Sequence, residues 1–194
     1  MAQLFVKISR DRIGVLIGPD GSVKEHIEKN LSVRLDINSE TGDVTISLDK
    51  DAQDPSLLFK AKDAVLAIGR GFSPERAYKL LEAEDVMLVI IDLREIFGRS
   101  PSDIERIKGR LIGKEGKTRR IIEEVTEAFI SVHGHTVSII GGIEQAEVAR
   151  EAVNLLIKGS QHVTVYRFLE RKRQELKKRK LELWEGRPLS PEET

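Results

Sequence analysis

The chain has 194 residues, of which 40% are hydrophobic, so it can form one large folded domain or two small ones. Its 32 Lys and Arg balance 32 Asp and Glu, and this formal net charge of zero argues against a polybasic protein that binds nucleic acid through its overall charge. The absence of cysteine excludes disulfides, thiol nucleophiles, iron–sulfur clusters and cysteine-bound zinc.

The first half of the chain shows alternating apolar residues, typical of strands, and apolar residues at helical spacing between turn and cap signals, typical of helices. These patterns predict a strand at 3–9, a short helix at 11–17, a glycine turn, a helix at 22–29, strands at 33–37 and 44–48, and a long helix at 55–69. A short helix at 76–81 follows, with apolar side chains to bury, which indicates a structured connector.

The second half repeats this order. The patterns predict a strand at 86–93, a helix at 104–112, a glycine turn at 113–116, a helix at 117–127, strands at 129–133 and 136–140, and a helix at 143–157. The strand at 86–93 is nearly all apolar, which predicts a central place in its sheet.

An internal repeat with an offset of 95 residues joins the two halves, because Leu-Ile-Gly-x-x-Gly occurs at 16–21 and again at 111–116. The sequence thus predicts an α+β protein with two packed β-α-α-β-β-α units. The expected segments are a first domain at 1–70, a connector at 71–84, a second domain at 85–159, a basic helical extension at 160–185 and a disordered tail at 186–194.

A G-x-x-G turn between two helices can bind an anion. Glycine lets the backbone turn sharply and approach a ligand closely. The second helix begins at the turn, so its free N–H groups and its positive dipole end favour an anion such as phosphate.

The sequences Ile-Gly-Pro-Asp-Gly at 17–21 and Leu-Ile-Gly-Lys-Glu-Gly-Lys-Thr-Arg-Arg at 111–120 resemble the I-G-x-x-G signature of KH domains. The element order resembles the type I KH fold, and two such turns in the same setting are far more specific than one. Together with the connector and the basic C-terminus, residues 2–180 resemble the archaeal members of the Partner-of-Nob family, which are small-subunit ribosome assembly factors.

This resemblance implies a single-stranded RNA ligand near the 3′ end of small-subunit ribosomal RNA. It also implies two protein partners, the PIN-domain nuclease that cuts there and the alpha subunit of translation initiation factor two. We expect no cofactor and a monomer. The alternative is a KH-fold adaptor that binds a translation factor or a nuclease and has little RNA contact of its own.

The net charge around the two G-x-x-G turns distinguishes the two copies more clearly than the turns themselves do. Residues 105–120 hold seven basic and two acidic residues, a net charge of +5, whereas residues 10–25 hold three of each. Because Lys and Arg contacts with phosphate dominate nucleic-acid affinity, the second copy is predicted to be the main RNA clamp. In the first turn Asp20 lies where a phosphate would approach, and Pro19 lacks an N–H donor, so we expect weak RNA binding or protein binding there.

The predicted RNA-binding residues of the second copy form the turn, supply charge beside it or border the groove for the bases. They are Gly113, Lys114, Glu115, Gly116, Lys117, Arg119, Arg120, Arg110, Lys108, Ile112, Ser131 and His133. A secondary site comprises Gly18, Pro19, Asp20, Gly21, Ser22 and Lys24. The basic cluster alone would fit a solvated helix face equally well, and its place beside the glycine turn favours RNA.

The C-terminal extension is the other basic region. Residues 166–185 hold eight basic and four acidic residues, a net charge of +4, with apolar residues at helical spacing. A charged helix in solvent is one interpretation. A helix that contacts ribosomal RNA or a partner protein is the other, and the RNA context favours it.

No catalytic or metal-binding pattern accompanies these features. Residues 116–118 match the end of a P-loop, but Leu111 stands where the first glycine is required, and a helix precedes the turn in place of a strand. His133 and His135 have no third metal ligand near them in sequence, and we interpret them as ordinary strand residues. We therefore expect no enzyme and no metal. Without a long apolar run or a signal-peptide layout, we expect a cytoplasmic protein that binds no membrane.

Overall fold

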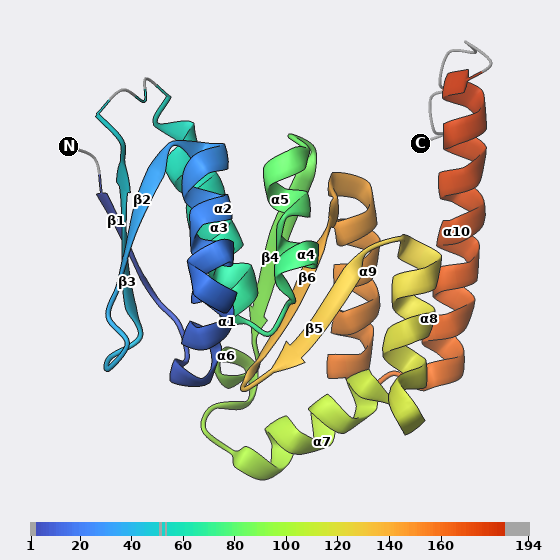
Figure 1. Cartoon of the computed structure of the whole chain (residues 1–194). Helices are drawn as coiled ribbons and strands as arrows, with labels where there is room; N and C mark the ends of the chain where they lie inside the picture. The colour runs from blue at the N-terminus through green and yellow to red at the C-terminus, as the bar shows by residue number, and fades with distance from the viewer. Residues whose placement is uncertain (1–2, 51, 53, 185–194) are drawn as a thin grey trace.

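The chain folds as two α+β units, each built on a three-stranded antiparallel sheet (Figure 1). A computed structural model describes residues 3–50, 52 and 54–184. The first unit comprises β1 (Gln3–Lys7), η1 (Arg10–Arg12), α1 (Ile13–Ile17), η2 (Pro19–Gly21), α2 (Ser22–Leu31), β2 (Val33–Ile37), β3 (Asp43–Leu48) and α3 (Ser56–Gly69). The second comprises β4 (Val86–Asp92), α6 (Leu93–Phe97), α7 (Pro101–Ile112), η3 (Lys114–Gly116), α8 (Lys117–Thr126), β5 (Phe129–His133), β6 (Thr136–Gly142) and α9 (Ile143–Ile157). The connector holds α4 (Pro74–Ala77) and α5 (Lys79–Glu82), and α10 (His162–Trp184) follows the second unit.

The predicted β-α-α-β-β-α order is confirmed in both units. Two details differ from the expectation. The connector helix is broken at Tyr78 into α4 and α5, and a short extra helix, α6, stands between β4 and α7. The predicted disordered tail at 186–194 lies outside the described residues.

The prediction that the apolar strand at 86–93 is central is wrong. The strand order is β1-β3-β2 in one sheet and β4-β6-β5 in the other, so β4 is an edge strand and β6 is central. The apolar character of β4 has another cause, because both of its faces are covered. Val86 and Leu88 pack against the core of the first unit, and Met87, Val89 and Ile91 pack against the core of the second.

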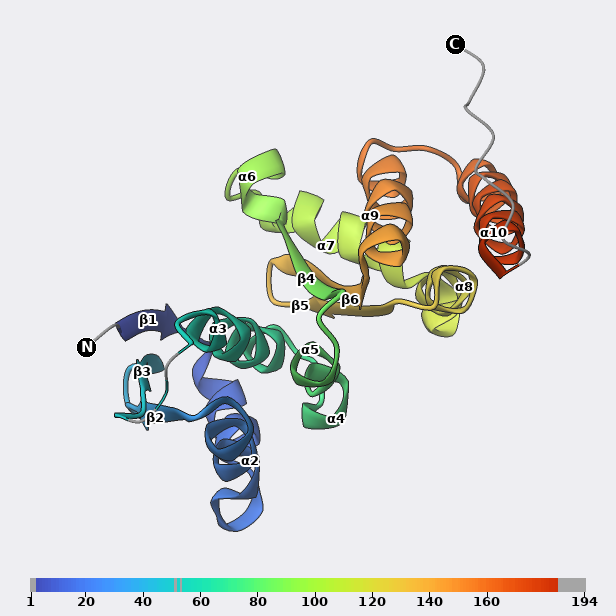
Figure 2. The same cartoon turned by 90° about the horizontal axis from the view of Figure 1, so that it is seen from above.

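The two units share a buried surface. Ile140 of β6 is fully buried and belongs to the same apolar cluster as Val65 and Ile68 of α3, whereas its neighbour Ile139 belongs to the cluster of the second unit. Seen from above, α3 and α5 lie between the two sheets, and α10 lies on the side of the second unit away from the first (Figure 2). The expectation that the two units pack together is therefore confirmed. Among the described helices, none is both long enough and apolar enough to cross a membrane.

Candidate nucleic-acid interface

The two glycine turns have nearly the same backbone. Gly18 and Gly113 have φ of 74° and 71°, in the region that favours glycine, and the residues two positions later, Asp20 and Glu115, have φ of 51° and 54°. A Cβ atom at Gly113 would also collide with Oγ1 of Thr118. The first glycine of each turn is therefore required by its conformation and by its close contact with the following helix.

The two turns differ in the groups that they offer to an anion. In the second turn the amide N–H groups of Lys114 and Glu115 donate to no acceptor within the described part of the chain. In the first turn Pro19 stands in place of Lys114 and has no N–H. The second turn thus presents one more backbone donor at the start of the ten-residue helix α8.

The side chains enlarge this difference. Lys114 and Lys117 are exposed, and neither forms an ion pair with a described residue. Arg120 donates from Nη2 to the carbonyl oxygen of Glu115 at 3.0 Å, so its guanidinium lies against the turn. The predicted cations of the turn are therefore gathered at one place, which carries the positive charge expected of a phosphate site.

Two other predicted cations have partners inside the protein. Arg110 donates from Nη2 to the carbonyl oxygen of Ser160 at 2.6 Å, and His162 Nε2 lies 3.0 Å from the carbonyl oxygen of Arg110. Lys108 pairs with Glu105 at 2.7 Å, and only 19% of its side chain is exposed. The contacts of Arg110 join the end of α7 to the start of α10, whereas the pair of Lys108 lies within α7. The RNA-binding role of Arg110 and Lys108 stays a prediction.

Helix α10 contacts the helix that follows the second turn. The hydroxyl of Tyr166 lies 3.1 Å from Oγ1 of Thr118, the residue against which Gly113 packs. Val165 and Leu169 are fully buried in the second core, which fixes α10 beside α8 (Figure 1). Part of the basic extension is thus structural, and the sequence alone gave no sign of the contact between Tyr166 and Thr118.

Strand β5 forms the other side of the predicted groove. The N–H of Ile130 donates to Oε1 of Glu123 on α8 at 2.7 Å, as the N–H of Leu35 donates to Glu28 at 2.7 Å in the first unit. Glu123 and Glu28 are 95 positions apart, so the repeat extends to this bridge between helix and strand. The sequence prediction missed this bridge, although the 95-residue offset could have pointed to it.

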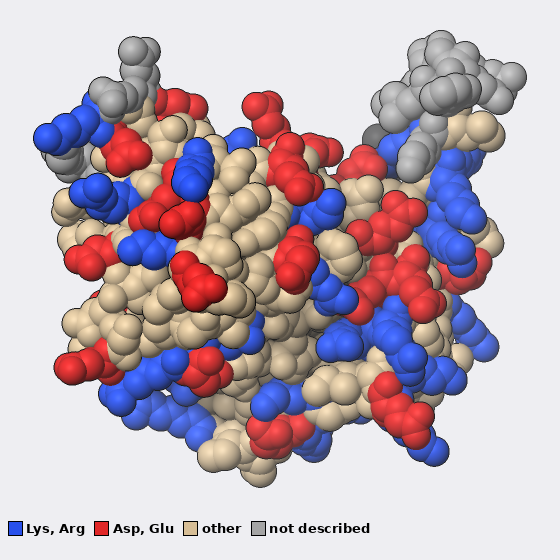
Figure 3. Space-filling model, viewed as in Figure 1, with Lys and Arg blue, Asp and Glu red and all other residues tan. Residues whose placement is uncertain are grey.

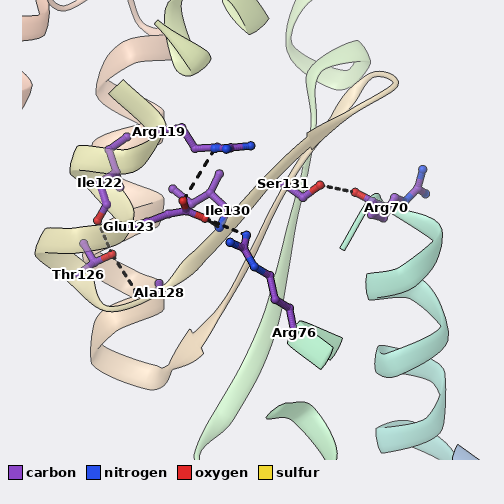
Figure 4. Close-up of polar contacts among 9 residues, drawn as sticks. All are labelled: Arg70, Arg76, Arg119, Ile122, Glu123, Thr126, Ala128, Ile130 and Ser131. Atoms are coloured by element: carbon purple, nitrogen blue, oxygen red, sulfur yellow. Dashed lines mark hydrogen bonds and ion pairs between the residues drawn. The ribbon is translucent and has the colours of Figure 1, made fainter. Parts of the chain in front are cut away.

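The two predicted groove residues of β5 contact the first unit. Ser131 donates to the carbonyl oxygen of Arg70 at 2.8 Å (Figure 4), and His133 Nε2 lies 3.2 Å from Oδ2 of Asp11. A hydrogen bond from Ser9, with a smaller contribution from His133, lowers the pKa of Asp11 and keeps it ionised. The RNA-binding role of Ser131 and His133 stays a prediction.

Figure 3 shows how charge is distributed around this region. Side chains of both signs are scattered over the visible face, with Lys and Arg on both sides of an uncharged area at the centre of its lower half. No three His, Asp or Glu residues are grouped to hold a metal ion within the residues that the structure describes. The arrangement offers donors and cations to phosphate and a groove beside β5 to bases.

Two G-x-x-G turns, each between two helices and beside an edge strand, define a protein with tandem type I KH domains, the class of fold that clamps single-stranded nucleic acid. Residues 87–174 match the family model for the second KH domain of PNO1, a eukaryotic-type (type I) KH domain. The chain belongs to the Partner-of-Nob (PNO1) family, as its sequence predicts.

Three relatives illustrate this membership. A KH domain-containing protein of Methanocaldococcus jannaschii is 48% identical over 180 residues, which cover 93% of this chain and 78% of that protein. The pre-rRNA-processing protein PNO1 of Coccidioides immitis is 30% identical over 142 residues, which cover 73% of this chain and 54% of that longer protein. The structure of Dim2p from Pyrococcus horikoshii, solved in a complex with the alpha subunit of initiation factor 2 and rRNA, is 48% identical with a TM-score of 0.83, and the match covers 90% of this chain and 95% of that one.

Proposed function

We propose that the chain binds single-stranded small-subunit ribosomal RNA during assembly of the small ribosomal subunit and that the second KH domain is the main clamp. One observation carries the proposal. Three of the cations that give residues 105–120 their net charge of +5 lie at the turn, namely Lys114, Lys117 and Arg120, and the amides of Lys114 and Glu115 there are free to donate. The rRNA in the complex of the P. horikoshii relative supports RNA as the ligand.

The proposed mechanism is binding without catalysis. The N–H groups of Lys114 and Glu115 and the positive end of α8 would hold a phosphate, while the ammonium groups of Lys114 and Lys117 neutralise the backbone on either side. The bases would enter the groove between α8 and β5, beside Ile112, and a KH domain holds about four nucleotides in this way. Aromatic residues make up 5% of the chain, so aliphatic contacts and hydrogen bonds would do most of the base recognition.

The alpha subunit of initiation factor 2, present in the complex of the relative, is the proposed protein partner. The first KH domain is the second candidate surface for a protein, because Asp20 is exposed at its turn and Pro19 removes a donor. The PIN-domain nuclease, the 3′ end as the binding position, the monomeric state and the cytoplasmic location stay predictions.

The test is a matched pair of variants that give both turns the same sequence. Lys114→Asp with Glu115→Asp makes the second turn Gly-Asp-Asp-Gly, and Pro19→Asp does so in the first. Affinity for a single-stranded RNA from the small-subunit 3′ end is measured by fluorescence anisotropy across a salt titration. We expect the second-turn variant to lose at least about tenfold in affinity and to show a shallower salt dependence. We expect the first-turn variant to lose less than about twofold. Equal losses, or no loss in the second-turn variant, would contradict the proposal.

A further inference from the structure

The groove of the second KH domain has a wall that the KH fold itself does not supply. A cavity of about 340 Å³ lies between Arg119 of α8, Ile130 and Ser131 of β5, and the connector at residues 71–76. The connector residues that line it are Gly71, Phe72, Ser73 and Arg76. Residues from outside the second KH domain therefore form part of the wall of its groove.

The connector is held closely against β5. Gly71 has a φ of +98°, and a Cβ atom there would lie 2.7 Å from Oγ of Ser131 and 2.8 Å from Cβ of His133. The preceding carbonyl, of Arg70, accepts the hydrogen bond from Ser131. Phe72 is buried in the first core, so the connector has little freedom to move away from the groove.

Arg76 is the side chain that this connector places at the groove (Figure 4). Its Nη1 lies 3.3 Å from Oε1 of Glu123, and its guanidinium lies 4.9 Å from the centre of the Phe129 ring. About 41% of the side chain is exposed, so part of the fork remains available to a ligand. The ion pair and the ring fix the position of Arg76 before any ligand arrives.

Arg119 adds a second donor group to the same cavity. Its Nε is buried and has no hydrogen-bond partner among the described residues, and it lies 3.8 Å from Oε2 of Glu123. Glu123 is already shared between Arg76, Arg119 and the N–H of Ile130. The hydroxyl hydrogen of Ser131 is used by the carbonyl oxygen of Arg70, so the charged donors in this cavity come from the two arginines.

We propose that Arg76 binds RNA from the connector and, with Arg119, reads one nucleobase in this cavity. The proposal rests on the proposed function of the second KH domain. A pair of guanidinium donors matches a base that presents two adjacent acceptors. Cytosine, through O2 and N3, and guanine, through O6 and N7, meet this condition, whereas adenine and uracil place a donor beside each acceptor at those edges. The connector thereby gives the second KH domain a base preference that the domain does not have alone.

The test uses the full chain and four single-stranded RNA octamers: oligo-C, oligo-A, oligo-U and alternating U and G. Arg76→Ala is compared with Arg150→Ala, which removes an exposed, paired arginine from α9, outside this cavity. We expect Arg76→Ala to weaken binding of oligo-C or of the alternating octamer by about tenfold and of oligo-A and oligo-U by less than about twofold. We expect Arg150→Ala to bind all four octamers as the wild type does.

Two further variants separate RNA contact from a purely structural role. Glu123→Gln keeps an oxygen acceptor for the N–H of Ile130 and for Arg76 but removes the negative charge that competes with RNA, so we expect unchanged or tighter RNA binding. Arg76→Lys keeps the charge and loses the fork, so we expect it to lose the base preference even if Arg76→Ala does not fold. An equal loss on all four octamers, a loss in Glu123→Gln as large as in Arg76→Ala, or an Arg76→Lys variant that keeps the preference would overturn the role of Arg76.

The two proposals fail in different ways. If the variant carrying both Lys114→Asp and Glu115→Asp binds every octamer as the wild type does, the proposed function of the second turn is wrong. If that variant loses binding while Arg76→Ala matches Arg150→Ala, the clamp stands and only the role of Arg76 is overturned.

Discussion

The two KH domains have the same turn backbone and different turn chemistry. Gly18 and Gly113 have φ of 74° and 71° and ψ of 174° and 178°, yet the residues between the glycines are Pro-Asp in one turn and Lys-Glu in the other. The glycines and the helix that follows fix the shape of the turn. The two variable positions and their neighbours decide whether that shape attracts a phosphate.

The connector also makes different contacts with the two domains. Tyr78 stacks on His26 of α2 in the first domain, with ring centres 4.0 Å apart, while Arg76 pairs with Glu123 of α8 in the second. One short segment thus gives an aromatic ring to the first domain and a guanidinium to the second. A duplicated fold becomes asymmetric through what lies between its copies as well as through changes within them.

The largest expected effect is a loss of stability in variants of the surface between the two domains, and it tests whether the two domains unfold as one unit. Ile139 and Ile140 are adjacent on β6 and fully buried, but they point into the second and the first core. We expect Ile139→Ala and Ile140→Ala each to lower the free energy of unfolding by about 2–5 kcal/mol, because both leave a cavity. Chemical denaturation measures the loss, and hydrogen exchange locates it.

The location of the loss distinguishes the two isoleucines. Increased exchange should reach α3 and α5 in Ile140→Ala and should concentrate in α7 and α9 in Ile139→Ala. A cost below about 1 kcal/mol for Ile140→Ala, with α3 protected as in the wild type, would mean that the domains are stable independently of each other.

Much of this asymmetric arrangement could be predicted from the sequence, because the relevant signals are local. The alternation in Val33, Leu35 and Ile37 and the glycine turns at fixed spacing locate strands and turns without knowledge of the tertiary fold. The extra helix α6 was missed although Asp92 caps it, with its side chain accepting from the N–H of Arg94 at 2.8 Å. That Asp stands at the end of an apolar run, a position where a cap is easily taken for the end of a strand.

The remaining features depend on which surfaces meet. An apolar edge strand such as β4 has the sequence of a central strand, because the first domain covers the face that would otherwise be exposed to water. Arg110 and Ser131 have polar side chains at positions that suit RNA, but carbonyl groups of Ser160 and Arg70 occupy them. Neither carbonyl lies near its partner in sequence, so no local pattern could indicate the contact.

A smaller effect is expected from removing the hydrogen bond between α10 and the helix after the second turn. Thr118 contacts Tyr166, whereas Val23 holds the equivalent place behind the first turn. Tyr166→Phe and Thr118→Val each remove the hydrogen bond, and we expect a loss of stability of about 0.5–1.5 kcal/mol. We expect RNA affinity to fall by about two- to fivefold because the turn is held less firmly. Thermal unfolding and anisotropy measure the two losses.

The variant with both Lys114→Asp and Glu115→Asp supplies the control for this support. If Tyr166 acts only by positioning the second turn, Tyr166→Phe should have no further effect on RNA affinity once the turn itself is disabled. A separate loss of the same size in that background would show that Tyr166 contacts RNA on its own.

The smallest effect concerns how the helices that lead into the two turns begin. Neither α1 nor α7 has a side chain that accepts from a backbone N–H at its start, but at the start of α7 the hydroxyl of Ser100 donates to the carboxylate of Asp103 at 2.8 Å. This hydrogen bond, with a smaller contribution from Arg106, lowers the pKa of Asp103 in the folded protein below its ordinary value of 3.8. Because the folded state favours the ionised carboxylate, its stabilising effect is present above about pH 4 and is lost as the pH falls through the lowered pKa.

Asp103→Asn keeps an acceptor for Ser100 and removes the charge, so it isolates this effect. We expect a slightly lower melting temperature than the wild type at pH 7 and a difference that shrinks as the pH falls below 4, because the wild-type carboxylate is then protonated as well. Since nearly half of the Asp103 side chain is exposed to solvent, salt should also reduce the difference. A difference that stays constant from pH 7 to pH 3 would mean that the charge of Asp103 does not contribute to the stability of the helix that leads into the second turn.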